Sequence, residues 1–296
     1  MAASEARRLD GAVGADRPAG RAVVRGLRAA GAHLLLLTAA AFFAFPFLWL
    51  LSSSVKTPAQ IFVFPPEWIP HPVSWANYPN AFAEMDFAHH FANTLTIAVP
   101  AVVGTVLSSS MPAYAFARLR WPGRDAVFVL VLATMMLPWL VTMIPVYILF
   151  HRLGWIGTYL PLIVPHFFGS AFYIFLLRQF FLTIPMELAE AARIDGASEP
   201  RIYAQMVMPL ARPALATTVL LTFINSYNDF LGPLIYLNRQ EMYTLSVGIL
   251  SFVGINIQKW ELLMAAAVMY CLPNIVLYFV AQKQFVQGIA TTGLKG

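Results

Sequence analysis

Residues 187–213 read ELAEAARIDGASEPRIYAQMVMPLARP, a polar and charged stretch that lies between long apolar segments. Gly196 can adopt the left-handed backbone conformation that ends a helix. Ser198 is a suitable N-cap for a second helix, with Pro200 in its first turn. Pro209 would end that second helix, because proline cannot continue the backbone hydrogen bonding. The stretch therefore predicts two short helices at an angle, with small residues at an exposed bend.

The composition excludes a soluble domain. Of the 296 residues, 59% are hydrophobic and only 11% are charged, whereas a soluble domain carries about 25% charged residues. The single cysteine, Cys271, cannot form an internal disulfide. We therefore interpret the chain as a membrane protein, and the polar stretch around Gly196 as an exception that needs its own explanation.

Six apolar stretches are long enough to cross a bilayer, for which about 20 residues are needed. They cover roughly residues 32–52, 91–115, 125–149, 156–177, 213–236 and 262–282. Every transmembrane structure must satisfy its backbone polar groups internally, and helices do so segment by segment. The predicted fold class is therefore all-α, a polytopic membrane protein with six transmembrane helices.

The distribution of basic residues predicts the orientation. Six spans place both termini on one side of the membrane, and 15 of the 19 Lys and Arg residues fall on that side. The positive-inside rule identifies it as the cytoplasm. Both termini and the stretch 187–213 are then cytoplasmic, and the net charge of +5 reports topology, so that no nucleic-acid partner is required.

The chain divides into four predicted segments. Residues 1–31, rich in Ala, Gly and Arg, predict a mobile basic cytoplasmic tail. Residues 32–90 form the first transmembrane helix and an extracytoplasmic loop, which is either a contact surface for a soluble partner or a stiff proline-rich connector. Residues 91–283 form a core of five transmembrane helices with the cytoplasmic loop 185–209, and residues 284–296 form a cytoplasmic tail.

The polar stretch resembles the EAA loop of ABC importer permeases. The positions that carry the resemblance are Glu190, Ala191, Ala192, Asp195, Gly196, Ala197 and Pro209. In that family the loop docks onto an ATPase subunit and transmits its nucleotide-driven closure, so the resemblance implies an ATPase-coupling role for these residues. Met206 and Met208 replace the usual Ile and Leu with side chains of similar volume. The alternative is an amphipathic helix that lies on the cytoplasmic leaflet.

Other segments resemble the carbohydrate-uptake branch of these permeases, which is similar to the maltose and glycerol-phosphate importers. Residues 227–230, Tyr-Asn-Asp-Phe, resemble a Trp-Asn-Asp/Glu-Phe cluster of sugar permeases, and residues 243–248 and 288–296 match the same group. The resemblance implies the type I importer permease fold and a sugar or glycosyl solute taken up by alternating access. It also implies a bacterial inner-membrane location, a second and different permease subunit, two ATPase subunits and an extracytoplasmic solute-binding protein.

A polar stripe runs along the fifth predicted span. Thr218, Thr222, Asn225 and Asp229 follow an i, i+4, i+7, i+11 spacing, which is one face of a helix, and Asn228 adjoins it. Ionisable groups inside a membrane usually face a cavity or a partner. We expect the stripe to line the solute path or to contact the second permease subunit. The alternative is an interfacial Asp229 that reaches water, with threonines that bond their own backbone.

No residue pattern indicates catalysis, a metal or a cofactor. The chain lacks a Gly-x-x-x-x-Gly-Lys-Ser/Thr phosphate loop, so it is not expected to hydrolyse ATP itself. His166 is interpreted as a packed core histidine, and the group around Glu84 and His89 as solvated loop charge. The rival functions are a secondary carrier driven by an ion gradient, which predicts inverted repeats and midplane charges, and a membrane enzyme or scaffold.

Overall fold

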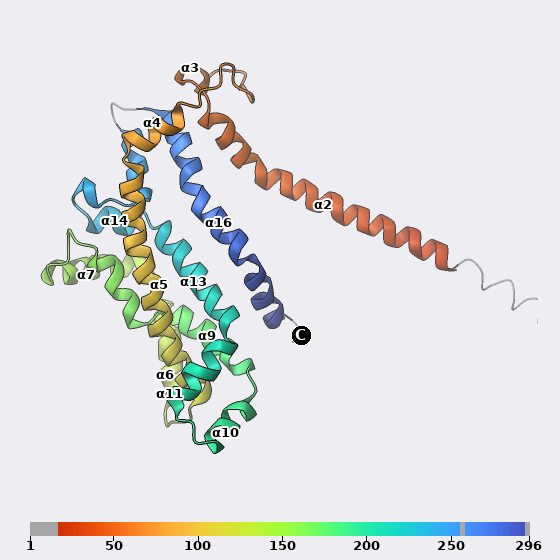
Figure 1. The fold of residues 1–296 in the computed structure, drawn as a ribbon, viewed down its shortest axis with the longest axis vertical. Coiled ribbons are helices and arrows are strands. Elements are labelled where there is room, and N and C mark those ends of the chain that lie inside the picture. Colours follow the sequence, from red (N-terminus) through yellow and green to blue (C-terminus); the bar gives the residue numbers. More distant parts are fainter. Residues whose placement is uncertain (1–16, 255–257, 294–296) are drawn as a thin grey trace, which may run out of the picture.

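The computed structural model describes residues 17–254 and 258–293, and the side chains of 26–254 and 258–282. In this part of the chain the regular structure is helical, apart from one isolated bridge between Val253 and Gln258. Figure 1 shows an elongated bundle from which one long helix stands away. We refer below to the α10 end and the α4 end of this bundle.

Five helices build the frame of the bundle. They are α2 (Arg17–Ser54), α5 (Phe87–Arg118), α9 (Ala171–Thr183), α13 (Arg212–Tyr227) and α16 (Trp260–Gly293). Helix α5 lies along the middle of the bundle and packs against α9 and α13, while α16 packs against α13 and α2 (Figure 1). The frame therefore depends mainly on α5, which runs between the two ends of the molecule.

Shorter elements connect and interrupt these helices. They are α3 (Pro58–Ile61), α4 (Asn77–Glu84), α6 (Arg124–Thr134), α7 (Trp139–Arg152), α8 (Leu160–Ile163), the 3₁₀ helix η1 (Val164–Phe168), α10 (Met186–Ile194), α11 (Glu199–Ile202), the π helix η2 (Tyr203–Val207), α12 (Met208–Leu210), α14 (Leu231–Tyr236), the 3₁₀ helix η3 (Gln240–Met242), α15 (Leu245–Gly248) and the 3₁₀ helix η4 (Ile249–Phe252).

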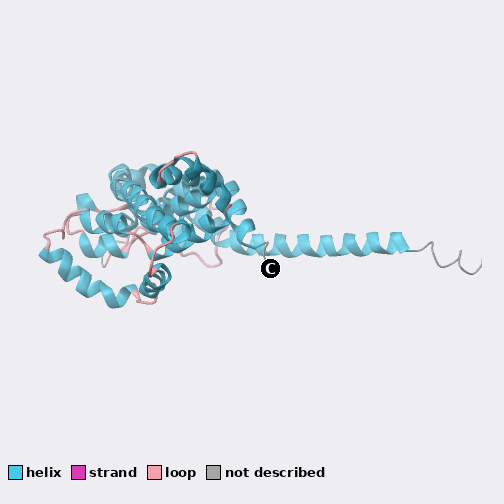
Figure 2. Cartoon of the chain, turned by 90° about the horizontal axis from the view of Figure 1, so that it is seen from below, coloured by secondary structure: helices cyan, strands magenta, loops and turns pink. Residues whose placement is uncertain are grey.

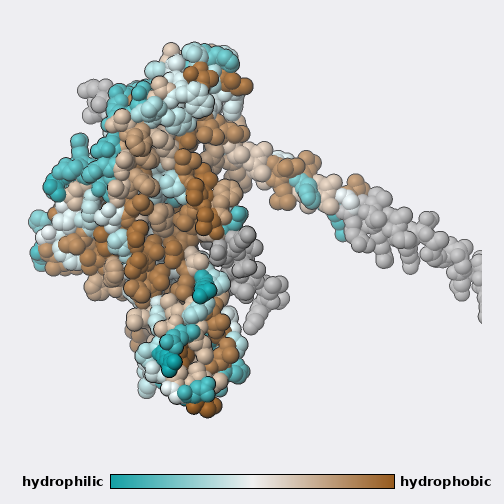
Figure 3. All heavy atoms as spheres, in the orientation of Figure 1, coloured by the Kyte–Doolittle hydropathy of each residue, from teal (hydrophilic) through white to brown (hydrophobic). Residues whose placement is uncertain are grey.

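Four segments are apolar and long enough to span a membrane, and two bent helix pairs raise the number to six. The four are Gly26–Ser54, Phe87–Arg118, Leu160–Thr183 and Trp260–Gln282. The α6–α7 pair bends by 92°, and the pair formed by Glu199–Leu210 and Arg212–Tyr227 bends by 78°. In the space-filling view an apolar belt crosses the middle of the molecule between more polar ends (Figure 3).

Three predicted spans are interrupted in the structure, and the one expected over 156–177 is divided into α8, η1 and α9. The prediction of one span over 125–149 was wrong in its continuity, because the chain bends between α6 and α7, where Pro138 restricts the backbone of the residue before it. The span expected over 213–236 is broken after Tyr227, and α14 begins only at Leu231. There the Asp229 side chain accepts a hydrogen bond from the Gly232 N–H at 3.1 Å, which competes with continued helix hydrogen bonding.

The predicted tails are helical where they are described. Helix α2 begins at Arg17, so residues 17–31 of the expected mobile tail are helical, and residues 1–16 lie outside the described part. Helix α16 continues through most of the expected tail 284–296 as far as Gly293, and the last three residues lie outside the description. Ala, Leu and Arg are strong helix formers, so the apolar helix extends through residues 17–31.

Helix α2 is separated from the bundle along most of its length, as both ribbon views show (Figures 1 and 2). Its membrane-length segment is not buried, and large apolar side chains such as Leu35 and Phe42 are more than two thirds exposed. Exposed apolar surface on this scale is compatible only with a lipid environment or an apolar protein partner. The first span is therefore a surface that something outside this chain must cover.

Small and hydroxyl-bearing residues of α5 hold the broken segment α8–η1. The Ser108 hydroxyl donates to the His166 carbonyl at 2.8 Å, and the Ser109 hydroxyl accepts from the Ser170 N–H at 3.2 Å. Gly104 lies against the ring of Phe167, and a Cβ placed on it would lie 2.7 Å from that ring. The side chains of α5 thus satisfy backbone groups that the broken helix frees, as a membrane interior requires.

We predict that Gly104→Ala lowers the stability of the protein by about 1–3 kcal/mol, because the added methyl group forces the Phe167 ring and η1 away from α5. Gly31→Ala is the matched control. Nothing lies within 4 Å of a Cβ at that position on α2, and alanine is the better helix former. Thermal unfolding of both variants in the same detergent checks this, and equal midpoints would contradict the close packing of α5 on η1.

Candidate functional site

The polar stretch forms two short helices with a turn between them. Helix α10 ends at Ile194, and Gly196 has a φ of +83°, as its place after the helix predicted. The Ala197 N–H donates to the Ala192 carbonyl at 2.9 Å and closes the turn. Ser198 occupies the N-cap position of α11 with extended backbone, but its hydroxyl makes no capping hydrogen bond.

The end of the second helix differs from the prediction. Pro209 does not stop it, but lies inside α12, and the 78° bend follows at Ala211. A proline within a helix removes one backbone bond and crowds the preceding turn. Here the preceding turn is the wider π helix η2, and Pro213 then starts α13 in its first turn, where proline is tolerated.

The tip of this stretch is exposed and carries an apolar side chain. Glu190, Ala191, Asp195 and Gly196 are exposed, whereas Ala192 and Ala197 are half-buried against the core. Ile194 is 86% exposed. The sequence analysis did not select Ile194, although an isoleucine in an otherwise polar loop was the signal that could have identified it. The tip thus combines small residues with one projecting aliphatic side chain.

A polar network fixes the stretch onto the end of α5. The Glu199 carboxylate accepts from Arg193 Nε at 2.6 Å and from the Tyr114 hydroxyl at 2.5 Å. Ser110 and Tyr203 share a hydrogen bond of 2.7 Å between their hydroxyls. The bond to Glu199 raises the pKa of the Arg193 guanidinium, so this group stays charged. Glu199, which the sequence analysis also passed over, therefore joins α10, α11 and α5.

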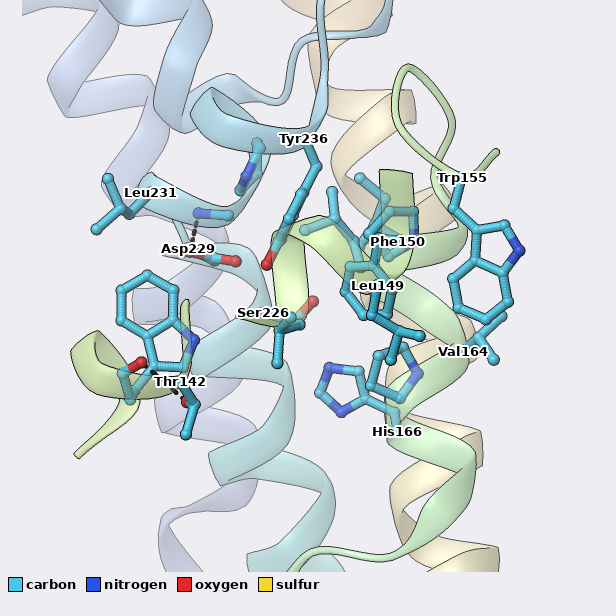
Figure 4. Close-up of a pocket in the computed structure, with 18 of the residues that line it drawn as sticks. Thr142, Leu149, Phe150, Trp155, Val164, His166, Ser226, Asp229, Leu231 and Tyr236 are labelled. Carbon is cyan, nitrogen blue, oxygen red and sulfur yellow. Dashed lines mark hydrogen bonds between the residues drawn. The ribbon is translucent and has the colours of Figure 1, made fainter. Parts of the chain in front are cut away.

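A second feature is a cavity of 1210 Å³ that is open to the outside of the bundle, since lining side chains such as Phe168 and Leu149 are exposed. Its walls come from α7, α8, η1, α13 and α14, which are the elements next to the helix breaks. Figure 4 shows the Asp229 carboxylate and the Tyr236 hydroxyl toward one end, His166 toward the other, and Ser226 between them. Its polar and aromatic lining residues include Trp139, Thr142, Trp155, His166, Asn225, Ser226, Asp229 and Tyr236.

The structure divides the predicted polar stripe. Asn225 and Asp229 line the cavity, but Thr218 and Thr222 are fully buried away from it. The Thr218 hydroxyl donates to its own helix, to the Ala214 carbonyl at 3.0 Å, whereas the buried Thr222 hydroxyl has no hydrogen-bond partner among the described residues. Asn228 accepts a hydrogen bond of 2.9 Å from the Tyr270 hydroxyl of α16. Thr218, Thr222 and Asn225 share the continuous helix α13, and only Asp229 lies beyond its end at Tyr227.

His166 has a hydrogen-bond partner, as a satisfied histidine requires, but it lines the cavity and is not packed in the core. It is half-buried and lines the cavity, with Nδ1 3.0 Å from the Thr105 hydroxyl oxygen. Pro161 and Pro165 on the broken segment precede it and were the signal that the helix opens here. Trp139, Thr142, Ser226 and Tyr236 were likewise not selected, because they come from elements that only the tertiary structure brings together.

The charged group near residue 84 takes part in ordinary contacts at the α4 end. Glu84 forms an ion pair with Lys259. One ring nitrogen of His89 lies 2.6 Å from the Glu241 carbonyl oxygen, and one of His90 lies 2.8 Å from that of Tyr243. Among the described side chains, no three His, Cys, Asp or Glu residues are grouped so that they could hold a metal ion.

An all-helical membrane bundle with an open, partly polar cavity and an exposed, anchored loop is typical of transport proteins. Residues 104–291 match the family described as the binding-protein-dependent transport system inner membrane component. The chain belongs to this family, and its fold is the type I ABC importer permease fold.

Curated relatives and a solved structure are similar over most of the chain. The osmoprotective compounds uptake permease protein GgtD of Synechocystis sp. is 32% identical, over 89% of this chain and 91% of the relative. The arabinooligosaccharides transport system permease protein AraQ of Bacillus subtilis is 34% identical, over 86% and 91%. A bacterial ABC transporter involved in the import of the acidic polysaccharide alginate has a chain with a TM-score of 0.77 at 27% identity, over 88% and 96%.

We predict that Glu199→Ala loosens α10 and α11 without unfolding the bundle. Arg193 and Glu199 are each about one third exposed, so solvent screening limits the loss to about 1 kcal/mol, or about fivefold faster amide exchange. Hydrogen exchange over residues 186–202 measures it. The control is Glu187→Ala, in the exposed first turn of α10 and outside the network, and equal exchange in both variants would contradict the anchor.

Proposed function

We propose that this chain is the permease subunit of an ATP-driven importer for a sugar or glycosyl solute, and that residues 186–197 dock onto a separate ATPase subunit. The observation that carries the proposal is Ile194, an 86% exposed aliphatic side chain at the tip of a loop that is otherwise fixed to the bundle. Isolated apolar side chains of this kind serve as anchors when they fill a pocket on a partner.

The small residues around Ile194 support this docking. Ala191 and Gly196 are exposed beside it, so that a partner's groove can approach the backbone of the turn closely. Glu190 and Asp195 contribute exposed charge at the rim. Glu190, Ala191, Ala192, Asp195, Gly196 and Ala197 would therefore act as one contact surface, and Pro209 as part of its support on the side of α13.

The hydrogen bond between Glu199 and Tyr114 would couple a movement of the docking loop to α5. A movement of α10 would displace Arg193 and Glu199, and with them Tyr114 on α5. Helix α5 also packs along the broken segment α8–η1, whose His166 lines the cavity. ATP-driven closure could thus change the access to the cavity by shifting α5 against elements that already contain breaks, which is alternating access by small rigid-body movement.

We extend the proposal to the positions of the remaining partners. A second permease, a different chain, would cover the exposed apolar face of α2. The α10 end would face the cytoplasm and the α4 end the extracytoplasmic side of a bacterial inner membrane. There a soluble solute-binding protein would contact the segment between α3 and α4, in which Phe64 is 91% exposed. One ATPase subunit would dock onto each of the two permeases, and both would act on a single solute path.

The lining of the cavity supports a carbohydrate. Trp139 and Tyr236 offer aromatic surface, and Thr142, Asn225 and Ser226 offer hydrogen-bond donors and acceptors. Mostly apolar walls with a few convergent polar groups are typical of small-molecule sites. AraQ is named for arabinooligosaccharides and the similar solved transporter for alginate, so sugars of different charge occur among the relatives.

For the docking surface, we predict that Ile194→Asp abolishes recovery of the ATPase when this chain is purified in mild detergent from its native host. A buried carboxylate without a partner disfavours binding strongly, so the yield of co-purified ATPase should fall at least about tenfold, which is roughly 1.4 kcal/mol. The matched control is Ile69→Asp, which changes a 75% exposed isoleucine at the opposite end of the bundle.

A chain that purifies alone in its unmutated form, and still transports in liposomes without ATP, would overturn the importer proposal. It would leave the ion-gradient-driven carrier as the function. ATPase recovery that is equal in Ile194→Asp and Ile69→Asp would remove Ile194 from the contact surface but retain the importer.

For the solute path, we predict that Asp229→Ala reduces uptake at least about fivefold in a complex that assembles normally, since the carboxylate both lines the cavity and caps α14. The control is the adjacent Asn228→Ala, because Asn228 faces α16 and not the cavity. Unchanged uptake in Asp229→Ala would exclude this carboxylate from the solute path.

A further inference from the structure

The cavity has an unbalanced charge. Asp229 supplies a carboxylate to its wall, and no lysine or arginine is among the described residues that line it. The carboxylate of Glu199 in the same chain, by contrast, is paired with the guanidinium of Arg193 at 2.6 Å. The cavity carboxylate has no such cationic partner among the described residues, and its hydrogen bonds come from backbone N–H groups such as that of Gly232.

The carboxylate is fixed in its place by the break between α13 and α14. The Gly232 N–H holds Oδ1 at 3.1 Å, and a Cβ on Gly232 would collide with the same carboxylate. The Ser246 hydroxyl donates to the Asp229 backbone carbonyl at 2.6 Å and holds the main chain from the other side. The acidic group is therefore a permanent part of the wall, and Gly232 is the residue that leaves room for it.

The rest of the polar lining is uncharged or aromatic. Thr142, Asn225 and Ser226 each present groups that donate or accept a hydrogen bond, and the Tyr236 hydroxyl points into the same space (Figure 4). These groups can replace the water around hydroxyls of a solute one for one. Trp139 adds an apolar ring face against which the C–H face of a pyranose or furanose can lie.

An acidic solute would bind in this cavity less favourably than a neutral one. To bind between these mostly apolar walls, its carboxylate or sulfonate must lose part of its water, and that loss is costly unless an opposite charge or strong donors compensate it. The described lining supplies no lysine or arginine, its basic side chain His166 lies toward the end opposite Asp229, and Asp229 adds a group of the same sign as the solute. An uncharged glycoside has neither cost, because it exchanges water hydrogen bonds for those of Asn225 and its neighbours.

We propose that this cavity selects uncharged glycosides and excludes acidic ones, so that the permease itself discriminates by charge. The proposal rests on the proposed sugar-import function and narrows its substrate class. The selection against acidic sugars would come from the fixed carboxylate of Asp229 and from the lack of a lysine or arginine among the described lining residues.

The test uses matched sugars that differ only by a carboxylate: glucose and glucuronate, galactose and galacturonate, mannose and mannuronate. The permease is purified as the complex with its co-purifying subunits, and each sugar is titrated while tryptophan fluorescence is recorded. Trp139 lines the cavity, so Trp139→Phe identifies the part of the signal that comes from it. The solute-binding protein is omitted, so that any selectivity between the sugars comes from the permease complex.

We expect at least one neutral sugar to change the Trp139 signal, with a half-saturating concentration at least about tenfold below that of its uronate, which is about 1.4 kcal/mol. Asn225→Lys places a cation on the exposed wall and should lower the uronate value at least fivefold. Asp229→Asn should reduce the ratio between the half-saturating concentrations of the uronate and its neutral partner. It serves as a second variant if the lysine disturbs the fold.

Two results would overturn the proposal, and they differ in what they leave standing. A uronate that binds as tightly as its neutral partner would refute the charge selection but retain the sugar importer. If none of the six sugars changes the Trp139 signal while the complex hydrolyses ATP, the cavity is not a sugar site, and the sugar part of the proposed function fails with it.

Discussion

Backbone polar groups in a membrane interior must find partners inside the protein, because the surrounding lipid offers none. This constraint explains why α5 has small and hydroxyl-bearing residues where it faces the broken segment α8–η1. Ser108 and Ser109 complete hydrogen bonds that the break leaves open, and Gly104 permits the close approach of Phe167. Without a continuous α5 to supply these groups, the interruptions in the neighbouring helices would be too costly to keep.

The interruptions in turn create the cavity. Trp139 begins α7 after the 92° bend, His166 lies in the 3₁₀ segment η1, and Asp229 lies between α13 and α14. Each of these side chains comes from a place where a helix stops or changes type, and all three line the same space. An unbroken set of six helices would pack its side chains against one another and leave no comparable room.

The loop at the α10 end combines a rigid base with an exposed tip. The base is the network of Glu199 with Arg193 and Tyr114, and the tip is the turn that carries Ile194. These two properties belong together, because a contact on a loosely held loop would move the loop alone. A loop held to α5, as we propose for this one, would instead transmit displacement into the bundle.

The sequence by itself determined what depends on local physics. Hydropathy located the spans, and Gly196 and Pro200 predicted the two short helices, because backbone conformation there depends on the residue itself. Tertiary structure decided the rest. The polar stripe from Thr218 to Asp229 assumed one continuous helix, but the Asp229 side chain bonds to the Gly232 backbone and the helix ends at Tyr227. The sequence could not predict the cavity lining either, because Trp139, His166 and Tyr236 come together only through packing between elements far apart in the chain.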